Sequence, residues 1–305
     1  MSLRIEKINK SFGSKQVLKN VSFSVNRGEA LGYLGRNGAG KTTTIRIMAD
    51  IFRADSGELL LDEKPIDHKK IRLGYLPEER GLYPKTKVGE QMIYIGELRG
   101  MKRQEAKKRA LDLLETLEAS EYWDKKLETL SKGNAQKIQL AIAVLHDPDI
   151  VILDEPFSGL DPVNASMLKK LIIREVERGK YVLFSSHQMP YVEEFCEHIA
   201  IINNGEIVLD GNIREIKRSY PRHRILINAE EDSEILLTSL KSLEADNIAS
   251  SVEITGKDIQ VILNDPKDKN LIFQSLLQKN FNIDKFEVVE PTLEEIFVEK
   301  AGEDT

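Results

Sequence analysis

A glycine-rich segment, residues 35–43, constrains the fold of this chain more than any other feature of its sequence. It follows an apolar run, residues 30–34, that is typical of a buried strand, and it precedes residues 44–49, which are typical of a helix. A glycine-rich turn between a strand and a helix can wrap its amides around phosphate oxygens, with the positive end of the helix dipole behind them. Lys41 can reach the β- and γ-phosphates of a nucleotide, and the Thr42 hydroxyl can ligate Mg²⁺. We therefore predict a phosphate-binding loop made of Gly35, Arg36, Asn37, Gly38, Ala39, Gly40, Lys41, Thr42 and Thr43.

The composition narrows the class of protein. A length of 305 residues predicts about two domains, and 41% hydrophobic with 31% charged residues is typical of a water-soluble globular protein. The net charge of -6 does not indicate a nucleic-acid-binding surface, which is normally basic. The single cysteine, Cys196, excludes an intramolecular disulfide and fits a reducing compartment. Residues 1–7 lack the apolar core of a signal peptide, and no apolar run approaches the roughly 20 residues that span a bilayer. If the protein acts at a membrane, we expect another chain to cross it.

The periodicity of the chain predicts an α/β core with a helical insertion. Turn residues separate short predicted strands at 3–8, 17–18, 21–25, 58–61 and 71–75. A Pro- and Gly-containing loop, residues 76–84, follows them. A helical subdomain is then expected over about 86–147, with helices at 88–99, 104–117 and 132–145. Ser131 is placed to cap the last of these helices, and on this segment alone an ordinary capped helix is the favoured interpretation.

Two carboxylates follow a fully apolar run, residues 150–153, that is typical of a central parallel strand. The carboxyl ends of such strands are where open α/β sheets bind ligands. Asp154 is the expected partner of an Mg²⁺ ion bound to Thr42, and Glu155 is the candidate to polarise an attacking water. His187 follows the next predicted strand, residues 181–185, and should therefore lie at the same edge.

The C-terminal part is predicted to form a separate small domain. Tyr220 and Pro221 mark the boundary, which divides the chain into domains 1–220 and 221–305. Beyond it the predicted elements follow a β-α-β-β-α-β order, which suggests a ferredoxin-like α+β domain without a catalytic cluster.

Over residues 3–220 the ordered motifs resemble those of an ATP-binding cassette (ABC) ATPase, the nucleotide-binding subunit of an ABC transporter. The resemblance implies a P-loop ABC ATPase core with an inserted helical subdomain, extended by the small α+β domain. Taken alone, Phe12 would be expected to pack on the core; the resemblance instead implies that it stacks on adenine. The motifs that match are Phe12, Gly35–Thr43 as Walker A, Glu78 at the Q-loop position, Leu130–Asn134 as the signature, Ile150–Glu155 as Walker B with the catalytic glutamate, Ser158–Asp161 as the D-loop, and His187 as the switch histidine.

Two motifs depart from the usual pattern of that family. Glu78 stands where most members have Gln, and the signature reads Leu-Ser-Lys-Gly-Asn in place of Leu-Ser-Gly-Gly-Gln. Both departures resemble a branch that serves exporters of sodium, antibiotics or peptides. The tail, residues 290–297, resembles the C-terminal extension of the same branch.

The resemblance implies ATP and Mg²⁺ as cofactors and a site shared by two subunits. Walker A of one subunit would bind ATP, and the signature of a second, Ser131, Lys132, Gly133 and Asn134, would close over it, with Asp161 in the adjoining D-loop. Glu155 and His187 would be the catalytic pair, and Thr42, Asp154 and Glu78 would hold the metal. The implied partners are a second copy or a related ATPase subunit, and a transmembrane permease that keeps the protein at the cytoplasmic face of the cell membrane.

Two other functions are compatible with an ABC ATPase. A relative acting on DNA would carry long coiled coils, and one acting on the ribosome would carry two cassettes; neither feature occurs in this sequence. A purely regulatory nucleotide switch is disfavoured because Glu155 and His187 are both present. We expect no nucleic-acid partner.

Overall fold

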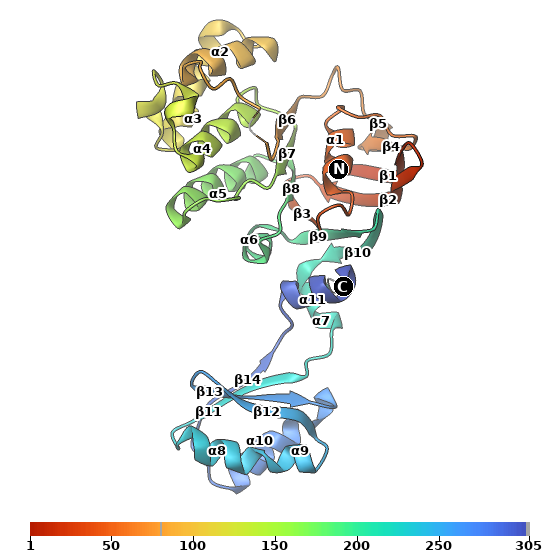
Figure 1. The fold of residues 1–305 in the computed structure, drawn as a ribbon, viewed down its shortest axis with the longest axis vertical. Helices are drawn as coiled ribbons and strands as arrows, with labels where there is room; N and C mark the ends of the chain where they lie inside the picture. Colours follow the sequence, from red (N-terminus) through yellow and green to blue (C-terminus); the bar gives the residue numbers. More distant parts are fainter. Residues whose placement is uncertain (80, 303–305) are drawn as a thin grey trace. The chain divides into compact units, whose positions relative to one another are not determined.

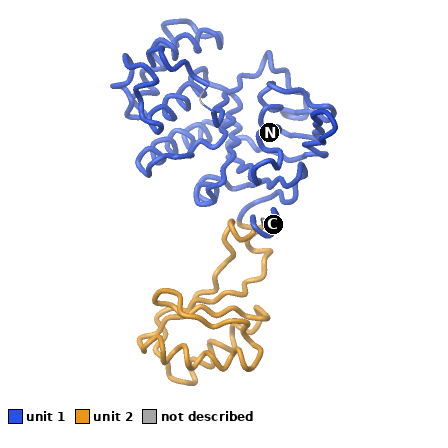
Figure 2. Tube along the Cα trace, in the orientation of Figure 1, with its two compact units in different colours: residues 1–213, 297–305 blue, residues 214–296 orange. Residues whose placement is uncertain are grey.

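The computed structural model describes residues 1–79 and 81–302, which form two compact units. Unit 1 contains Met1–Ile213 together with the chain from Phe297 onward, and unit 2 contains Arg214–Ile296 (Figure 2). The expected boundary at residues 220 and 221 therefore differs from the observed one. The chain returns to unit 1 because its last helix is bonded there: Asn203 Nδ2 donates to Ala301 O at 3.2 Å. Residue 80 of the expected loop 76–84, and residues 303–305 of the expected second domain, lie outside the described residues.

A mainly parallel six-stranded sheet forms the centre of unit 1 (Figure 1). Its strand order is β10-β9-β3-β8-β7-β6, and only the edge strand β10 is antiparallel to its neighbour. Every residue of β3, β7 and β8 is buried, as predicted for apolar runs in the middle of a parallel sheet. The strands are β3 (Ala30–Gly35), β6 (Leu73–Leu76), β7 (Ile150–Asp154), β8 (Tyr181–Ser185), β9 (His198–Asn203) and β10 (Glu206–Asn212).

A second, antiparallel sheet of unit 1 has the order β2-β1-β4-β5. The two short strands expected at 17–18 and 21–25 are one strand, in which Leu18 is buried and alternate residues from Val21 to Val25 face the core. The strand expected at 3–8 extends further, so that Phe12 is the last residue of β1, paired with Lys15. The strands are β1 (Ser2–Phe12), β2 (Lys15–Asn26), β4 (Ser56–Leu61) and β5 (Lys64–Pro65).

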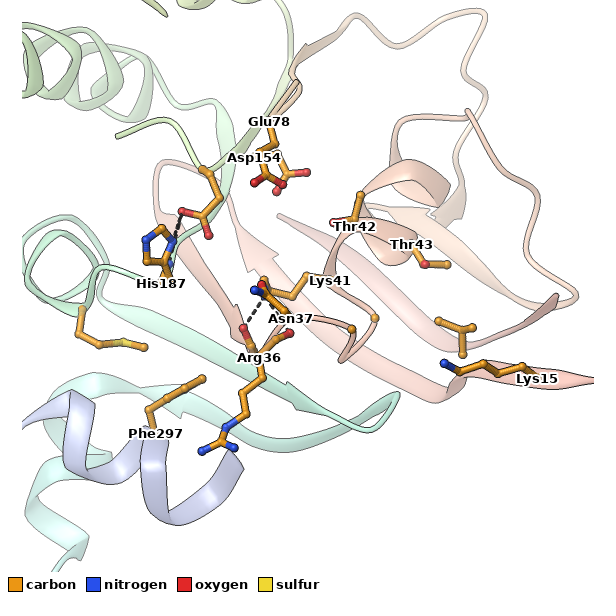
Figure 3. A pocket seen from close by; sticks show the side chains of 16 residues that line it. Lys15, Arg36, Asn37, Lys41, Thr42, Thr43, Glu78, Asp154, His187 and Phe297 are labelled. Carbon is orange, nitrogen blue, oxygen red and sulfur yellow. Dashed lines mark hydrogen bonds and ion pairs between the residues drawn. The ribbon is translucent and has the colours of Figure 1, made fainter. Parts of the chain in front are cut away.

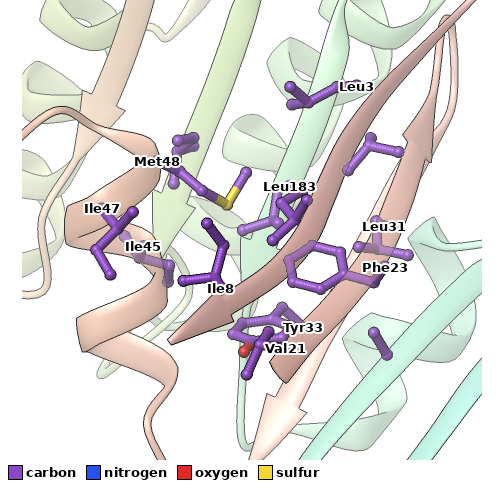
Figure 4. Packing of buried hydrophobic residues seen from close by; sticks show 14 of the residues in the cluster. Leu3, Ile8, Val21, Phe23, Leu31, Tyr33, Ile45, Ile47, Met48 and Leu183 are labelled. Carbon is purple, nitrogen blue, oxygen red and sulfur yellow. The ribbon is translucent and has the colours of Figure 1, made fainter. Parts of the chain in front are cut away.

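The main core of unit 1 lies among the two sheets and helix α1 (Lys41–Met48) (Figure 4). Phe23 of β2 stacks on Tyr33 of β3 with ring centroids 4.9 Å apart. Ile45 and Met48 contribute from α1. This packing supports α1, and hence the glycine-rich loop, from behind.

The helical subdomain predicted over about 86–147 contains α2 (Val88–Leu98), α3 (Arg103–Thr116) and α4 (Lys132–Val144), which lie together at one side of unit 1 (Figure 1). Small residues bring the helices close: a Cβ on Gly96 of α2 would lie 2.7 Å from that of Ala106 in α3. Helices α6 (Met189–Phe195) and α7 (Ile213–Ser219) were not predicted, because each is only seven residues long. The remaining helices of unit 1 are the 3₁₀ turns Ser120–Tyr122 and Leu127–Thr129, α5 (Pro162–Glu177) and α6 (Met189–Phe195).

Unit 2 has the predicted ferredoxin-like fold, with a four-stranded antiparallel sheet in the order β12-β13-β11-β14. Ile225, Ile227 and Val261 of the sheet are buried in one cluster with Ile272 and Leu276 of α10. The helix expected over 233–243 is two helices, α8 and α9. Unit 2 includes β11 (Arg224–Ala229), α8 (Ser233–Leu240), α9 (Ser242–Ala245), β12 (Ala249–Thr255), β13 (Asp258–Leu263), a 3₁₀ turn (Pro266–Asp268), α10 (Lys269–Gln278) and β14 (Ile283–Val289).

Two helices contain residues of both units: α7 (Ile213–Ser219) and α11 (Leu293–Ala301). No helix in the described ranges has both the length and the apolar character that crossing a bilayer requires.

Candidate nucleotide site

A cavity of about 800 Å³ opens in unit 1 at the carboxyl ends of β3, β7 and β8 (Figure 3). It brings together the glycine-rich loop, both carboxylates that follow β7, and the histidine that follows β8. Because parallel strands end at the same edge of a sheet, these groups lie close together, as the sequence predicted. The described lining residues are Lys15, Val17, Gly35, Arg36, Asn37, Gly38, Gly40, Lys41, Thr42, Thr43, Glu78, Asp154, Glu155, His187, Met189 and Phe297.

The loop needs its glycines for two different reasons. Gly38 and Gly40 have φ of 80° and 115°, in the left-handed region that favours glycine. Gly35 needs space, because a Cβ there would lie 2.6 Å from the carbonyl oxygen of Ile202. Gly40 is the N-cap of α1, which begins at Lys41 and not at Thr44 as predicted. The earlier start brings the free amides of the first helical turn to the cavity.

Lys41 lies folded over its own loop. Its Nζ donates to the carbonyl oxygens of Gly35 and Arg36, the latter at 3.1 Å. Burial lowers the pKa of the ammonium, while the nearby carboxylates of Glu155, Asp154 and Glu78 act in the opposite direction. The ammonium is therefore a positive charge close to the three carboxylates of the cavity.

Asp154 is 2% exposed and has one oxygen without a partner among the described residues, Oδ2. Its Oδ1 accepts a hydrogen bond of 2.5 Å from Ser185 Oγ, and burial raises its pKa. Figure 3 shows Glu78 beside Asp154, with Thr42 on the loop facing them. Two carboxylates and a hydroxyl are oxygen donors of the type that Mg²⁺ prefers.

These side chains fit a magnesium site that is shared with a nucleotide better than one that protein ligands complete alone. Within residues 1–79 and 81–302, no group of three or more His, Cys, Asp or Glu side chains is arranged to hold a metal ion. An ion here would need further oxygens, and the phosphates of a nucleotide are the usual source. The unpartnered Oδ2 of Asp154 supports this fit.

Glu155 and His187 form a pair at the edge of the cavity. Nδ1 of His187 lies 2.8 Å from Oε2 of Glu155, and the His187 amide donates to the same oxygen at 3.4 Å. Glu155 has φ of 50°, which is unusual for a residue with a side chain. The sequence did not predict this turn, which directs the carboxylate toward His187. Burial raises the pKa of Glu155, and the contacts with His187 oppose that shift.

Two residues predicted to bind nucleotide do not line the cavity. Ala39 is buried inside the loop. The ring of Phe12 packs edge-on against Phe52, with centroids 5.5 Å apart, and Lys10 Nζ lies 5.4 Å from its centroid. Phe12 remains 46% exposed, so its stacking on adenine stays a prediction.

The signature segment does not join its own cavity. None of Ser131, Lys132, Gly133 and Asn134 is among the described lining residues. Ser131 caps α4 as predicted, accepting from the Asn134 amide at 3.3 Å, and Asn134 Nδ2 donates to Tyr122 OH at 2.7 Å. Lys132 lies against the D-loop, since a Cβ on Gly159 would be 2.5 Å from its Nζ.

The D-loop residue Asp161 has a structural role in the single chain. It caps α5, accepting from the backbone amide of Asn164 at 2.9 Å and from its side-chain amide at 2.5 Å. These bonds hold the pKa of Asp161 below its usual value.

Four residues of the cavity were missed by the sequence analysis: Lys15, Val17, Met189 and Phe297. Lys15 and Val17 begin β2, directly after the turn that follows Phe12. Phe297 is the last residue of the tail, residues 290–297, that resembles the C-terminal extension of the family branch. That resemblance was the only sequence feature that pointed to Phe297. Met189 gave no signal beyond its position shortly after His187.

Comparisons with known proteins agree with this geometry. A family profile described as ABC transporter matches residues 18–158, and one described as the C-terminal domain of DrrA1-3-like ATP-binding proteins matches residues 211–301. The chain is 41% identical to the uncharacterized ABC transporter ATP-binding protein YhaQ of Bacillus subtilis (strain 168), covering 98% of each chain. It is 31% identical to the linearmycin resistance ATP-binding protein LnrL of the same strain, again over 98% of each.

A solved structure of an ATP-binding subunit of an ABC transporter superposes with a TM-score of 0.66 at 27% identity, covering 72% of this chain and 92% of the other. The fold and the sequence thus lead to one family. At 41% identity over almost the whole of both chains, the similarity to YhaQ shows that this chain belongs to the ABC transporter ATP-binding proteins, which are ATPases.

Proposed function

We propose that this ATPase works as a head-to-tail pair that drives export through a separate transmembrane permease, from the cytoplasmic face of the cell membrane. ABC cassettes dimerise and act with transmembrane subunits as a family. The similarity to LnrL, whose name ties it to antibiotic resistance, supports export as the direction of transport.

The observation that carries the proposal is the separation of two half-sites in one chain. Lys41, Asp154, Glu155 and His187 meet in one cavity, whereas Ser131 begins a helix outside that cavity. The amides of that first turn suit a phosphate. A second copy, related by two-fold symmetry, can supply the missing helix, and one interface then completes two sites.

In this mechanism the chain's own residues position the phosphates and the water. Lys41 and the loop amides hold the β- and γ-phosphates, and Thr42, Asp154 and Glu78 are the side chains suited to the metal. A bound Mg²⁺ supplies charge neutralisation for the phosphates. Glu155 orients the attacking water and accepts its proton, and His187 holds the carboxylate in place while it contacts the γ-phosphate.

Mixing two inactive variants tests the paired site. Lys41→Ala lacks a working loop, and Ser131→Arg lacks a working signature. A mixed dimer has one doubly damaged site and one intact site. Under random pairing half of the dimers are mixed, so about a quarter of wild-type activity is expected at most.

The matched control replaces Ser131→Arg by the double variant Lys41→Ala/Ser131→Arg. Mixed with Lys41→Ala, it leaves no intact site, and the mixture should stay inactive. Recovery of activity in the first mixture alone supports the paired site. If both mixtures stay at background, each site is built within one chain and the dimer proposal fails.

A further inference from the structure

Helix α11 presents one face to the protein and the other to solvent. Leu293, Ile296 and Ala301 are buried, at the spacing of one helical face, and Phe297 on the same face is half-buried. Val298, the next residue, is 39% exposed. The helix belongs to the C-terminal family domain by sequence, yet from Phe297 onward it is part of unit 1.

The end of α11 is bonded next to the phosphate-binding loop. Asn203 Nδ2 donates to the carbonyl oxygen of Ala301 at 3.2 Å. The preceding residue, Ile202, pairs with Gly35 in the parallel register of β3 and β9, and its carbonyl oxygen is the atom that a Cβ on Gly35 would meet. The helix is thus fixed to the strand that borders the loop.

This attachment places Phe297 in the wall of the nucleotide cavity. Figure 3 shows its side chain on the side of the cavity that carries His187 and Arg36, away from Lys15. Met189, which is 7% exposed, also lines the cavity. The end of the cavity that holds the reacting groups therefore has an apolar border, made in part by a residue from the C-terminal helix.

We propose that Phe297 is a positioning residue of the ATPase reaction, whose ring borders the phosphate end of the cavity and limits the access of bulk water to the Glu155 carboxyl group, which is 9% exposed. This inference rests on the proposed binding of ATP, with its γ-phosphate near Glu155. A phenyl ring offers a phosphate no hydrogen bond, so it adds little to ground-state binding. It excludes water, which strengthens the interactions of Lys41 and Glu155 with the charge that develops on the phosphate.

Steady-state kinetics of the full-length chain test the proposal. Phe297→Ala should lower kcat roughly tenfold while KM stays within about twofold, because the wall acts on the reacting groups and not on the bound nucleotide as a whole. Phe297→Leu retains an apolar side chain of similar bulk and should recover most of kcat. Val298→Ala, on the exposed side of the same helix, is the matched control and should behave as wild type.

Two results would overturn the proposal. One is a wild-type kcat for Phe297→Ala; the other is an equal loss in Phe297→Ala and Val298→Ala, which would assign the effect to the helix and not to the ring. Wild-type turnover and the effect of Glu155→Gln are measured in the same assay. The proposed position of ATP beside Glu155 fails if the wild type does not turn over or if Glu155→Gln turns over at the wild-type rate, so the two conclusions remain distinguishable.

A fluorescence measurement keeps the proposal testable if Phe297→Ala does not fold. Phe297→Trp places an indole at the cavity wall, and addition of Mg²⁺-ATP should change its emission relative to the wild type, whose only tryptophan is Trp123. Val298→Trp should show no nucleotide-dependent change beyond that of the wild type. Equal responses from both variants would remove Phe297 from the site.

Discussion

Nδ1 of His187 lies 2.8 Å from Oε2 of Glu155, and the two side chains differ sharply in exposure: 65% for the imidazole and 9% for the carboxyl group. The buried carboxylate is therefore held from one side by a residue that remains accessible to a ligand. In the proposed mechanism this arrangement leaves the other carboxylate oxygen for the water and the open face of the imidazole for the γ-phosphate.

Glu78 should alter how the enzyme uses its metal. Glu78→Gln removes one negative charge beside Asp154 while keeping an oxygen donor, so the Mg²⁺ concentration for half-maximal ATPase activity should rise several-fold, about 3- to 10-fold. A Mg²⁺ titration of both proteins at saturating ATP measures the change. Glu79→Gln, which changes a neighbouring carboxylate that does not line the cavity, is the control. Superimposable titrations for wild type and Glu78→Gln would show that Glu78 is not at the metal.

Asp147 should stabilise unit 1 through its ring of cations. Arg178, Lys180 and Arg109 place nitrogens 2.7, 3.1 and 3.3 Å from its Oδ1. Burial acts to raise its pKa, but Lys180, Arg178 and Arg109 outweigh it and hold the pKa at about 2.

Removing that charge leaves the cations facing one another. Asp147→Asn should lower the free energy of unfolding by about 1–2 kcal/mol, because the partly buried network is worth more than a single exposed pair. Urea denaturation measures the change. Glu97→Gln, which breaks one exposed pair with Arg103, should change stability by less than about 0.5 kcal/mol. Equal effects of the two substitutions would contradict a special role for Asp147.

His146 should make the folded state sensitive to mild acid. It is 7% exposed and its Nε2 donates to Leu73 O at 3.1 Å. Burial, with nearby Arg99, Arg72 and Arg109, lowers its pKa from 6.5 to about 4. Between pH 6.5 and pH 4, the His146 side chain therefore binds a proton in the unfolded chain but not in the folded chain.

Acid therefore destabilises the folded chain. The contribution of His146 to the free energy of unfolding is fully present above pH 6.5, and it is lost as the pH falls toward 4, by about 3 kcal/mol in total. His146→Gln keeps a donor for Leu73 O without a titrating group. Its unfolding free energy, measured against pH, should therefore fall less steeply between 6.5 and 4 than that of the wild type. Parallel pH profiles would show that His146 titrates normally in the folded chain.

The sequence predicted the parts of the site that depend on neighbouring residues. Glycines between a strand and a helix determine the loop from Gly35 to Thr43, and apolar runs determine the strands that end at Asp154 and before His187. The order of strands and helices in unit 2 was predictable for the same reason, because each element has its own periodicity.

Features that depend on tertiary packing were not predictable. The left-handed turn at Glu155 has no local signal, since the residue is not glycine. Phe12 was expected, taken alone, to pack on the core, but its partner Phe52 comes from a distant segment and was not predicted; its stacking on adenine stays a prediction. Phe297 reaches the cavity only because the last helix returns to unit 1, and no pattern in the sequence shows where a helix is attached.

The ATPase rate of Glu155→Gln, measured together with its bound ATP, tests the central claim most directly. The amide cannot accept the proton of the attacking water, whereas the loop and Lys41 are unchanged. The account predicts that turnover falls by about 10²- to 10⁴-fold, while ATP remains bound and the protein elutes as a dimer in its presence. Turnover at the wild-type rate would contradict the assignment of Glu155 and the mechanism built on it.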